Sequence, residues 1–368
     1  MNVLICAGGT GGHVFPALAV AVRLRELGHV VTWMGAPDSF ESKRVPEAGF
    51  PIELVRVSGL RGKGALKLFA APLLLLRALR DAFGVLQKVQ PDVVLGMGGF
   101  AAGPGGLAAW IKRTPLVIHE QNAAAGLTNR LLARIATTVL QAFPNTFKGK
   151  AQTVGNPVRV GFAELPAPAI RLAREGRARL LVVGGSQGAK ALNEIVPRAL
   201  ALIPATERPE VRHQAGRTLT TACAAYIAVD LMSWVDDLRH VQEFIADMPY
   251  AYEEADLVIC RSGASTIAEL SAAGCASLLV PFPFAVDDHQ TANARYLADA
   301  GAALLIPERE LTPQRLADEL QRLLADRAAL IRMGEAARAK AWVTATDEIV
   351  KALLAAPHPP SPIPASRL

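Results

Sequence analysis

The chain has 368 residues, of which 51% are apolar, 20% charged and 5% aromatic. This composition excludes a disordered or fibrous chain and supplies apolar side chains for two packed cores, so we expect a soluble α/β protein of two domains. The net charge of +6 favours an anionic partner, such as a membrane surface or nucleotide phosphates. The few aromatic residues, and the lack of a helix dense in Arg and Lys, argue against nucleic acid.

The chain shows no sign of export or of membrane insertion. It begins with a strand pattern, without a basic segment followed by a long apolar stretch, so no signal peptide is expected. No run reaches the roughly 20 uninterrupted apolar residues that span a bilayer. The four cysteines lie far apart without a CxxC pair, so we expect reduced thiols in a cytosolic protein and no zinc site. They are Cys6, Cys223, Cys260 and Cys275.

Apolar strand patterns alternate with helical patterns along the chain, which is typical of a doubly wound parallel sheet with helices on both faces. The predicted elements, in order, are a strand over 2–7, a glycine-rich turn, a helix to residue 27, strands over 29–35, 92–96 and 116–119, and later strands over 255–260 and 277–280. The pattern restarts near residue 178, where RLLVVGGSQGAKALNEIV echoes MNVLICAGGTGGHVFPAL. We therefore expect two similar domains of the nucleotide-binding type.

The domain boundary is predicted near a proline-rich stretch. We assign residues 1–160 to an N-terminal domain and 161–345 to a C-terminal domain, and we allow the last helix to pack back on the N-terminal domain. Pro157, Pro166 and Pro168 fit a linker between them. Residues 357–368, PHPPSPIPASRL, are expected to be disordered.

The first glycine-rich turn, AGGTGGHVFP over 7–16, suits an anion, because glycines let backbone N–H groups approach it at a helix N-terminus. The dinucleotide fingerprint requires a glycine where Val14 stands and an acidic residue closing the second strand, and a Walker A loop requires GK[ST]. Neither GGTGGHV nor GGSQGAK satisfies them, so NAD and P-loop sites are excluded, whereas a tight structural turn stays open. His13 is a candidate general base, or it only hydrogen-bonds the loop.

Two motifs of the C-terminal half follow predicted strands. RSGASTIAEL, over 261–270, suits a helix N-terminus with free N–H groups. Glu269, one turn inside, either compensates the helix dipole or binds paired sugar hydroxyls. PFPFAVDDHQTANA, over 281–294, carries Asp287 and Asp288, which lack a DxD spacing and predict no metal site.

The segment 66–89 is unusually apolar and carries interspersed basic residues. It is too short and too charged to span a membrane, and part of it must pack on the sheet. The rest either belongs to the core or docks on anionic lipid, and Trp110 could extend such a patch. The candidate patch consists of Lys67, Leu68, Phe69, Leu75, Leu76, Arg77, Leu79, Arg80, Phe83 and Trp110.

Taken together, these motifs closely resemble the MurG family of bacterial UDP-N-acetylglucosamine:undecaprenyl-pyrophosphoryl-N-acetylmuramoyl-pentapeptide N-acetylglucosaminyltransferases. The motifs occur in the family's order over residues 1–305, and they are GGTGGHVFPALA, GMGGFAAGPGGLAAW, HEQNAAAGLTNR, GNPVR, GGSQGA, CRSGASTIAEL and PFPFAVDDHQTANA. The resemblance implies a GT-B fold, with two Rossmann-like domains facing across a cleft. It also implies an inverting hexosyl transfer from UDP-N-acetylglucosamine to the muramoyl 4-hydroxyl of lipid I, without a metal or other cofactor.

The same resemblance implies a place and a process for the reaction. The N-terminal domain would hold the lipid acceptor and the C-terminal domain the UDP-sugar. The protein would bind peripherally to the anionic cytoplasmic face of the inner membrane. Its product, lipid II, would serve peptidoglycan synthesis and thereby cell-wall biogenesis, cell shape and cell division.

Site residues are carried over position by position. His13 matches the family's candidate general base, and Glu120 could compete with it. The resemblance implies that Thr10, Gly11 and Gly12 approach the donor and the acceptor diphosphate, and that Arg159 and Ser186 bind the UDP diphosphate. It implies that Asn122 and Gln290 contact the donor sugar and that the backbone of Ile245 contacts the uracil. The run that would cover the diphosphate and ribose, with Glu269 on ribose hydroxyls, is Ala264, Ser265, Thr266, Ile267, Ala268 and Glu269.

Three alternatives stay open at this point. A UDP-sugar 2-epimerase shares this architecture but needs no lipid acceptor, so the apolar and basic segment 66–89 would have no role. A related GT-B transferase could use another glycolipid. A membrane scaffold that binds nucleotide sugars without catalysis would give no product with any acceptor.

Overall fold

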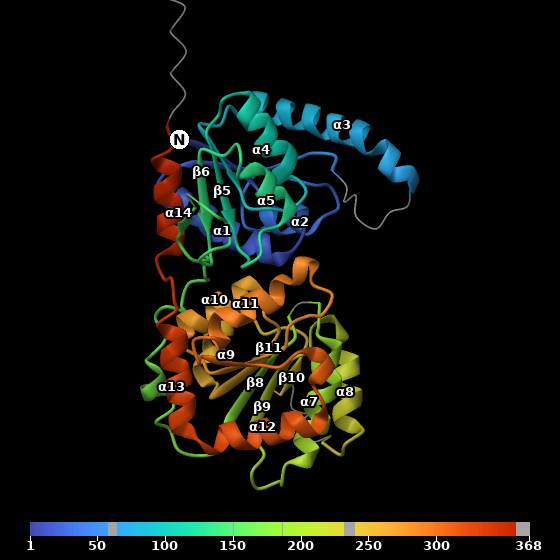
Figure 1. Cartoon of the computed structure of the whole chain (residues 1–368), viewed down its shortest axis with the longest axis vertical. Coiled ribbons are helices and arrows are strands. Elements are labelled where there is room, and N and C mark those ends of the chain that lie inside the picture. The colour runs from blue at the N-terminus through green and yellow to red at the C-terminus, as the bar shows by residue number, and fades with distance from the viewer. Residues whose placement is uncertain (58–64, 150, 186, 232–239, 358–368) are drawn as a thin grey trace, which may run out of the picture. The chain divides into compact units, whose positions relative to one another are not determined.

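The computed structural model describes residues 1–57, 65–149, 151–185, 187–231 and 240–357, with only the helical backbone described over 65–71 (Figure 1). The chain forms two compact units. Unit 1 consists of Met1–Val158 together with the chain from Thr344 onward, and unit 2 is Arg159–Val343. Each unit is built on one parallel sheet.

In the described part of unit 1, the sheet has seven strands in the order β3-β2-β1-β4-β5-β6-β7. Their bounds are β1 Asn2–Cys6, β2 Val30–Gly35, β3 Ile52–Leu54, β4 Val93–Gly96, β5 Leu116–Glu120, β6 Thr138–Gln141 and β7 Gln152–Thr153. Successive side chains of a strand point to opposite faces, and Val3 and Ile5 of β1 belong to one core cluster while Leu4 and Cys6 belong to another. A strand that is apolar at every position therefore suits a sheet covered on both faces.

Helices supply both cores of unit 1. Their bounds are α1 Gly11–Glu26, α2 Phe40–Glu47, α3 Ala65–Val89, α4 Ala102–Ile111, α5 Leu127–Leu132 and α14 Ala345–Leu354. Apolar side chains of α1, α2 and α14 pack with Val3 and Ile5, whereas those of α3, α4 and α5 pack with Leu4 and Cys6. The helices thus form a layer on each side of the sheet.

The last helix, α14, packs on the first helix of unit 1. Ile349, Val350 and Leu353 are buried in the same cluster as residues of α1. Arg23 of α1 donates a hydrogen bond of 2.8 Å to Asp347 of α14, in an exposed ion pair. The chain therefore returns to unit 1 after it has completed unit 2. The tail over 358–368 lies outside the described residues.

Where the structure describes unit 2, its sheet has six parallel strands in the order β10-β9-β8-β11-β12-β13. The strands are β8 Arg179–Val183, β9 Glu210–Gln214, β10 Val241–Gln242, β11 Leu257–Cys260, β12 Ser277–Leu279 and β13 Ala303–Leu305. The helices are α6 Pro168–Arg171, α7 Lys190–Leu202, α8 Leu219–Ile227, α9 Met248–Glu254, α10 Ala264–Ala273, α11 His289–Ala298, α12 Pro313–Ala325 and α13 Arg327–Arg338. Helices α7, α8 and α12 pack on one face, and α10 contacts α9, α11 and α13.

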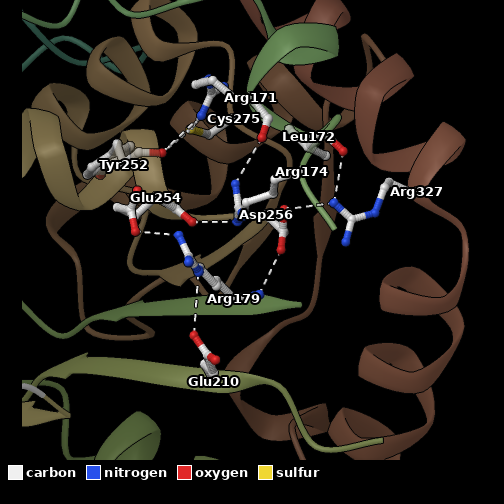
Figure 2. A network of polar contacts seen from close by, with 10 residues as sticks. All are labelled: Arg171, Leu172, Arg174, Arg179, Glu210, Tyr252, Glu254, Asp256, Cys275 and Arg327. Atoms are coloured by element: carbon white, nitrogen blue, oxygen red, sulfur yellow. Dashed lines mark hydrogen bonds and ion pairs between the residues drawn. The ribbon is translucent and has the colours of Figure 1, made fainter. Parts of the chain in front are cut away.

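A network of arginines and carboxylates ties the segment before β8 to the amino-terminal edge of this sheet (Figure 2). Asp256, just before β11, accepts a hydrogen bond of 2.7 Å from the backbone N–H of Arg179 and pairs with Arg174 at 2.9 Å. Arg171 donates to the backbone oxygens of Ala273 and Gly274 at 2.9 and 2.7 Å. These contacts lie at the edge opposite the carboxyl ends of the strands, so we assign them a structural role.

The predicted elements agree with the structure to within two residues at each end. The strand predicted over 2–7 is β1, the helix predicted to end at 27 is α1, and the strands predicted over 116–119 and 277–280 are β5 and β12. Cys6 and Cys260 are buried in β1 and β11, and burial raises the pKa of the Cys6 thiol to about 12.

Candidate functional site

The strand order marks the ligand-binding end of each sheet. β1 lies between β2 and β4, and β8 lies between β9 and β11, so the order reverses beside the first strand of each unit. Ligands of such sheets bind beyond the carboxyl ends of the strands at this reversal. The loops there are 7–10 and 97–101 in unit 1, and 184–189 and 261–263 in unit 2. Described residues of four sequence motifs, AGGTGG, GMGGF, GGSQG and RSG, lie on these loops.

The two loops of unit 1 are in direct contact. The N–H of Gly8 donates to the carbonyl oxygen of Gly98 at 3.3 Å, and the N–H of Met97 donates to Cys6 at 2.9 Å. Gly99 has a φ of +84°, and a Cβ added there would lie 2.2 Å from the carbonyl oxygen of Gly8. Only glycine fits so close an approach, which explains why the second loop is also glycine-rich.

Helix α1 begins at Gly11 without a side-chain cap. Thr10 has extended backbone with φ of −133°, and its side chain makes no capping hydrogen bond. Gly9, Thr10 and Gly12 are exposed. The first N–H groups of an α-helix have no intrahelical acceptor, so this end presents donors and the positive end of the helix dipole to an anion.

A buried glutamate, Glu41 of α2, holds this loop from behind. It is 1% exposed and accepts hydrogen bonds from the N–H groups of Gly9 at 3.0 Å and Ala36 at 3.1 Å. Glu41 was not among the predicted site residues, and its segment, SFESK, carries no pattern that indicates a functional residue. Glu41 therefore stabilises the glycine loop through these hydrogen bonds.

His13, on the first turn of α1, is joined to two buried polar residues of the segment HEQN. Its Nδ1 lies 2.8 Å from Oε1 of Gln121, and Nε2 of Gln121 lies 3.2 Å from Nδ1 of His119. Nε2 of His119 lies 2.9 Å from the carbonyl oxygen of Gly155, which opens the motif GNPVR. The structure thus connects three sequence motifs, although His119 and Gln121 were not among the predicted site residues.

Glu120 orders the loop that follows β5. One carboxylate oxygen accepts from the N–H and the side-chain amide of Asn122 at 3.0 and 3.2 Å. The other accepts from the N–H of Gly126 at 3.1 Å and from Asn129 at 2.9 Å. Glu120 is 1% exposed, so four donors surround a buried carboxylate. This arrangement favours a role in placing Asn122 over the role of general base.

In unit 2, helix α10 begins at the end of β11 in the same way as α1 begins after β1. Its N-cap Gly263 has no side chain to cap the first turn, and Ser265 and Thr266 are half-buried there. The side chain of Ile267 is buried in the core, and its N–H bonds the carbonyl oxygen of Gly263 at 3.0 Å. Ser186, of the preceding motif GGSQG, lies outside the described residues.

Arg159 and Glu269 form an ion pair. Nε and Nη2 of Arg159 lie 2.9 and 2.7 Å from the same carboxylate oxygen, Oε1 of Glu269. The Glu269 side chain is 10% exposed and the Arg159 side chain 43% exposed. Burial raises the pKa of Glu269, and the adjacent guanidinium opposes this rise. Arg159, predicted to bind the diphosphate, and Glu269, predicted to bind the ribose, are therefore in direct contact.

Two further predicted residues make local contacts in unit 2. The N–H of the buried Ile245 donates to Oε1 of Gln214 at 3.2 Å, so Gln214 supports this backbone. Oε1 of Gln290 accepts from the N–H of Phe282 at 3.0 Å, and the Gln290 carbonyl accepts from Oγ of Ser262 at 2.7 Å. These bonds bring the start of α11 to the loop before α10.

The candidate membrane patch is partly exposed. Leu75 and Leu76 of α3 are 52% and 64% exposed, and Trp110 of α4 is 51% exposed. Leu79 and Phe83 are half-buried and pack against the core. Arg77 and Arg80 are exposed, while the side chains of Lys67, Leu68 and Phe69 lie outside the described residues. Helices α3 and α4 are in contact, so the exposed apolar residues belong to adjacent helices.

The described residues contain neither a cluster of metal ligands nor a membrane-spanning helix. No group of three or more His, Cys, Asp or Glu side chains in this part of the chain could hold a metal ion. Nor is any helix there long and apolar enough to cross a bilayer.

Residues 3–141 match the glycosyltransferase family 28 N-terminal domain, and residues 179–349 match the glycosyltransferase family 28 C-terminal domain. Relatives from Nitrosococcus oceani and Alkalilimnicola ehrlichii are 54% and 57% identical. The alignments cover 96% and 92% of this chain and 98% and 94% of the relatives. Both carry the name UDP-N-acetylglucosamine--N-acetylmuramyl-(pentapeptide) pyrophosphoryl-undecaprenol N-acetylglucosamine transferase.

Solved structures agree with this result. The crystal structure of Acinetobacter baumannii MurG is 39% identical, has a TM-score of 0.82, and is matched over 96% of this chain and 99% of its own. The calicheamicin glycosyltransferase CalG4, at 18% identity and a TM-score of 0.65 over 98% of this chain and 99% of its own, shares the fold alone. With its two parallel-sheet units the chain has the GT-B fold, and it belongs to glycosyltransferase family 28.

Proposed function

We propose that this chain transfers N-acetylglucosamine from UDP-N-acetylglucosamine to the 4-hydroxyl of the muramoyl group of lipid I, undecaprenyl-pyrophosphoryl-N-acetylmuramoyl-pentapeptide, and so forms lipid II for peptidoglycan synthesis. The observation that carries the proposal is the identity of 54–57% over nearly the full length of relatives named for this transfer. Glycine-rich loops at the strand-order reversal of both sheets support it, because the substrates carry diphosphates.

We assign the acceptor to unit 1 and the UDP-sugar to unit 2. In unit 1, the uncapped start of α1 offers N–H groups to a diphosphate. In unit 2, the uncapped start of α10 and the half-exposed guanidinium of Arg159 offer positive charge to UDP. The ion pair with Glu269 holds this guanidinium in place. Glu269 belongs to α10, and we assign it to contact with the ribose.

In the proposed step, the His13 ring accepts the proton of the muramoyl 4-hydroxyl. The hydroxyl oxygen forms a bond to the anomeric carbon of N-acetylglucosamine from the side opposite UDP, and the bond to the UDP oxygen breaks. UDP leaves with the electron pair, and donors at the helix N-terminus and Arg159 stabilise its added negative charge. Attack from the opposite side inverts the anomeric configuration.

Membrane association is part of the proposal. Lipid I is a membrane lipid, and we propose that the chain meets the cytoplasmic face of the inner membrane peripherally. Leu75, Leu76 and Trp110 would enter the interface, while Arg77 and Arg80 would contact anionic headgroups.

The test is a transfer assay with the purified full-length chain. Radiolabelled UDP-N-acetylglucosamine is incubated with lipid I in detergent or with a short-chain analogue, and label in the lipid product is measured. We expect label to enter the lipid only when the acceptor is present. Epimerised UDP-sugar without acceptor would instead identify a 2-epimerase, and donor binding without any product would identify a scaffold. Transfer to other glycolipids alone would identify a related transferase.

A further inference from the structure

We propose that Gln121 and His119 are positioning residues that fix the proton of neutral His13 on Nδ1, so that Nε2 is the nitrogen that accepts the acceptor's proton. This inference rests on the proposed function only for the catalytic use of His13. The assignment of the proton itself rests on hydrogen-bond chemistry within unit 1, where all the residues concerned lie.

The assignment starts at Gly155, because its carbonyl oxygen can only accept a hydrogen bond. Nε2 of His119 lies 2.9 Å away and must therefore carry a proton. His119 is fully buried, and burial lowers its pKa to about 4, so the ring is neutral near pH 7. A neutral ring with its proton on Nε2 has a lone pair on Nδ1.

The orientation of Gln121 follows from two acceptors on His119. Nε2 of Gln121 lies 3.2 Å from Nδ1 and 3.1 Å from the backbone carbonyl oxygen of His119. An amide oxygen in this place would face two lone pairs, so the NH₂ group occupies it. Gln121 is also fully buried, so water does not compete for these contacts.

The amide oxygen of Gln121 is then turned toward His13. It lies 2.8 Å from Nδ1 of His13, and an amide oxygen accepts but cannot donate. Nδ1 of His13 must therefore carry the proton, and its Nε2 carries the lone pair in the neutral ring. Among the described residues, Nε2 of His13 has no hydrogen-bond partner, and the ring is half-buried.

Packing restricts the ring to this orientation. A Cβ added to Gly98 would lie 3.0 Å from Cε1 and 3.1 Å from Nδ1 of His13, so the glycine backbone lies against the ring. Two buried carboxylates, Glu41 of α2 and Glu120 at the end of β5, belong to elements next to the loops around His13. Both are bonded to backbone N–H groups instead of the ring. The neutral amide of Gln121 is thus the group that orients the imidazole.

This arrangement has a chemical consequence. When Nε2 takes the acceptor's proton, the imidazolium keeps its Nδ1–H bond to the Gln121 oxygen, and a hydrogen bond from a charged donor is stronger than one from a neutral donor. The amide has no charge, so it stabilises the imidazolium less than a carboxylate would. The chain of bonds therefore selects the tautomer of the neutral ring.

The tautomer can be read directly by nuclear magnetic resonance of the full-length chain labelled with ¹⁵N-histidine, without any substrate. We expect the neutral His13 ring to show a protonated Nδ1 and an unprotonated Nε2, and Gln121→Leu to populate both tautomers. Gln141→Leu is the matched control, since Gln141 is another buried glutamine of unit 1 whose partners are Thr153 and Phe147. A proton on Nε2 in the native chain, or an unchanged tautomer in Gln121→Leu, would overturn the inference.

Kinetics provide the second readout. Gln121→Leu should lower kcat about 10- to 100-fold, by analogy with residues that orient metal-ligating histidines, with KM for UDP-N-acetylglucosamine unchanged. Gln121→Glu keeps the oxygen that accepts from His13 and adds a negative charge, and its second carboxylate oxygen then faces Nδ1 and the carbonyl oxygen of His119. The tautomer of His13 should be retained, and the acid limb of the pH–rate profile should move upward by about one pH unit. A fall in kcat equal to that of Gln141→Leu, with no change of the pH profile in Gln121→Glu, would indicate a structural role. If the native chain makes no lipid II, the proposed function fails while the resonance experiment still decides the tautomer.

Discussion

Substitution of Gly99 by alanine tests the contact between the two loops of unit 1. The new Cβ would lie 2.2 Å from the carbonyl oxygen of Gly8, and the neighbour is backbone, so it cannot rotate away. To bring the new Cβ and the Gly8 oxygen to an ordinary van der Waals distance, one of the two loops must move by about 1 Å. A displacement of this size lowers the rate about 100-fold when it separates reacting groups. Alanine at a φ of +84° adds about 1–2 kcal/mol of backbone strain, and the overpacking adds about 1–3 kcal/mol.

A second glycine separates these two effects. Gly28 follows α1, has a φ of +79°, and has no atom within 4 Å of an added Cβ. Gly28→Ala should therefore lose about 1–2 kcal/mol of unfolding free energy through backbone strain alone and keep its transferase rate. Gly99→Ala should lose about 2–5 kcal/mol and most of its kcat.

The assay pairs urea unfolding, followed by circular dichroism, with the initial rate of transfer at saturating UDP-N-acetylglucosamine and lipid I analogue. Each variant is compared with the native chain under the same conditions. Equal destabilisation of Gly99→Ala and Gly28→Ala, with native transfer rates in both, would refute the argument that the two loops must touch at Gly99.

Three further predictions follow from buried groups. Glu41→Ala leaves two backbone N–H groups without their acceptor, so the free energy of unfolding in urea should fall by about 2–5 kcal/mol. An unchanged unfolding midpoint would contradict the proposal that this carboxylate supports the glycine loop. Glu269→Gln loses an ion pair whose arginine is 43% exposed, so the free energy of unfolding should change little. If Glu269 binds the ribose as proposed, the loss of charged hydrogen bonds should raise KM for UDP-N-acetylglucosamine at least about tenfold, and an unaltered KM in steady-state kinetics would refute this role. Burial lowers the pKa of His119 from 6.5 in the unfolded chain to about 4 in the folded chain, so the unfolded chain binds a proton first as the pH falls. The free energy of unfolding should therefore be complete above pH 6.5 and fall by about 3 kcal/mol as the pH drops toward 4. His119→Gln should flatten this part of the curve of unfolding free energy against pH, and identical curves for the native chain and the variant would refute the prediction.

Much of the sheet architecture could be predicted from the sequence, because strands covered on both faces are apolar at every position. The run over 2–7 is such a case, and Val3 and Leu4 indeed face different cores. The sequence allowed the last helix to pack on either domain, and it did not predict that α14 returns to unit 1. An amphipathic pattern shows that a helix covers an apolar surface, but it does not say which of two sheets supplies that surface.

The site was harder to predict, because its contacts join residues that are far apart in the chain. His13 could be singled out by its position after a glycine loop at the end of a strand, yet its partner Gln121 is 108 residues away. Arg159 and Glu269, which are 110 residues apart, were assigned separate ligands, and only the structure shows their ion pair. Glu41 carried no signal at all, since a glutamate in a short polar helix usually faces solvent.

The central claim is that N-acetylglucosamine is transferred to lipid I with inversion, and the linkage in the product tests it most directly. The purified chain is incubated with UDP-N-acetylglucosamine, in which the sugar is α-linked, and a short-chain lipid I analogue. The product is then identified by mass spectrometry and nuclear magnetic resonance. We predict a disaccharide with N-acetylglucosamine β-linked to the muramoyl 4-hydroxyl, formed in equal amount with UDP. An α linkage, an epimerised UDP-sugar, or release of UDP that does not depend on the acceptor would contradict the account.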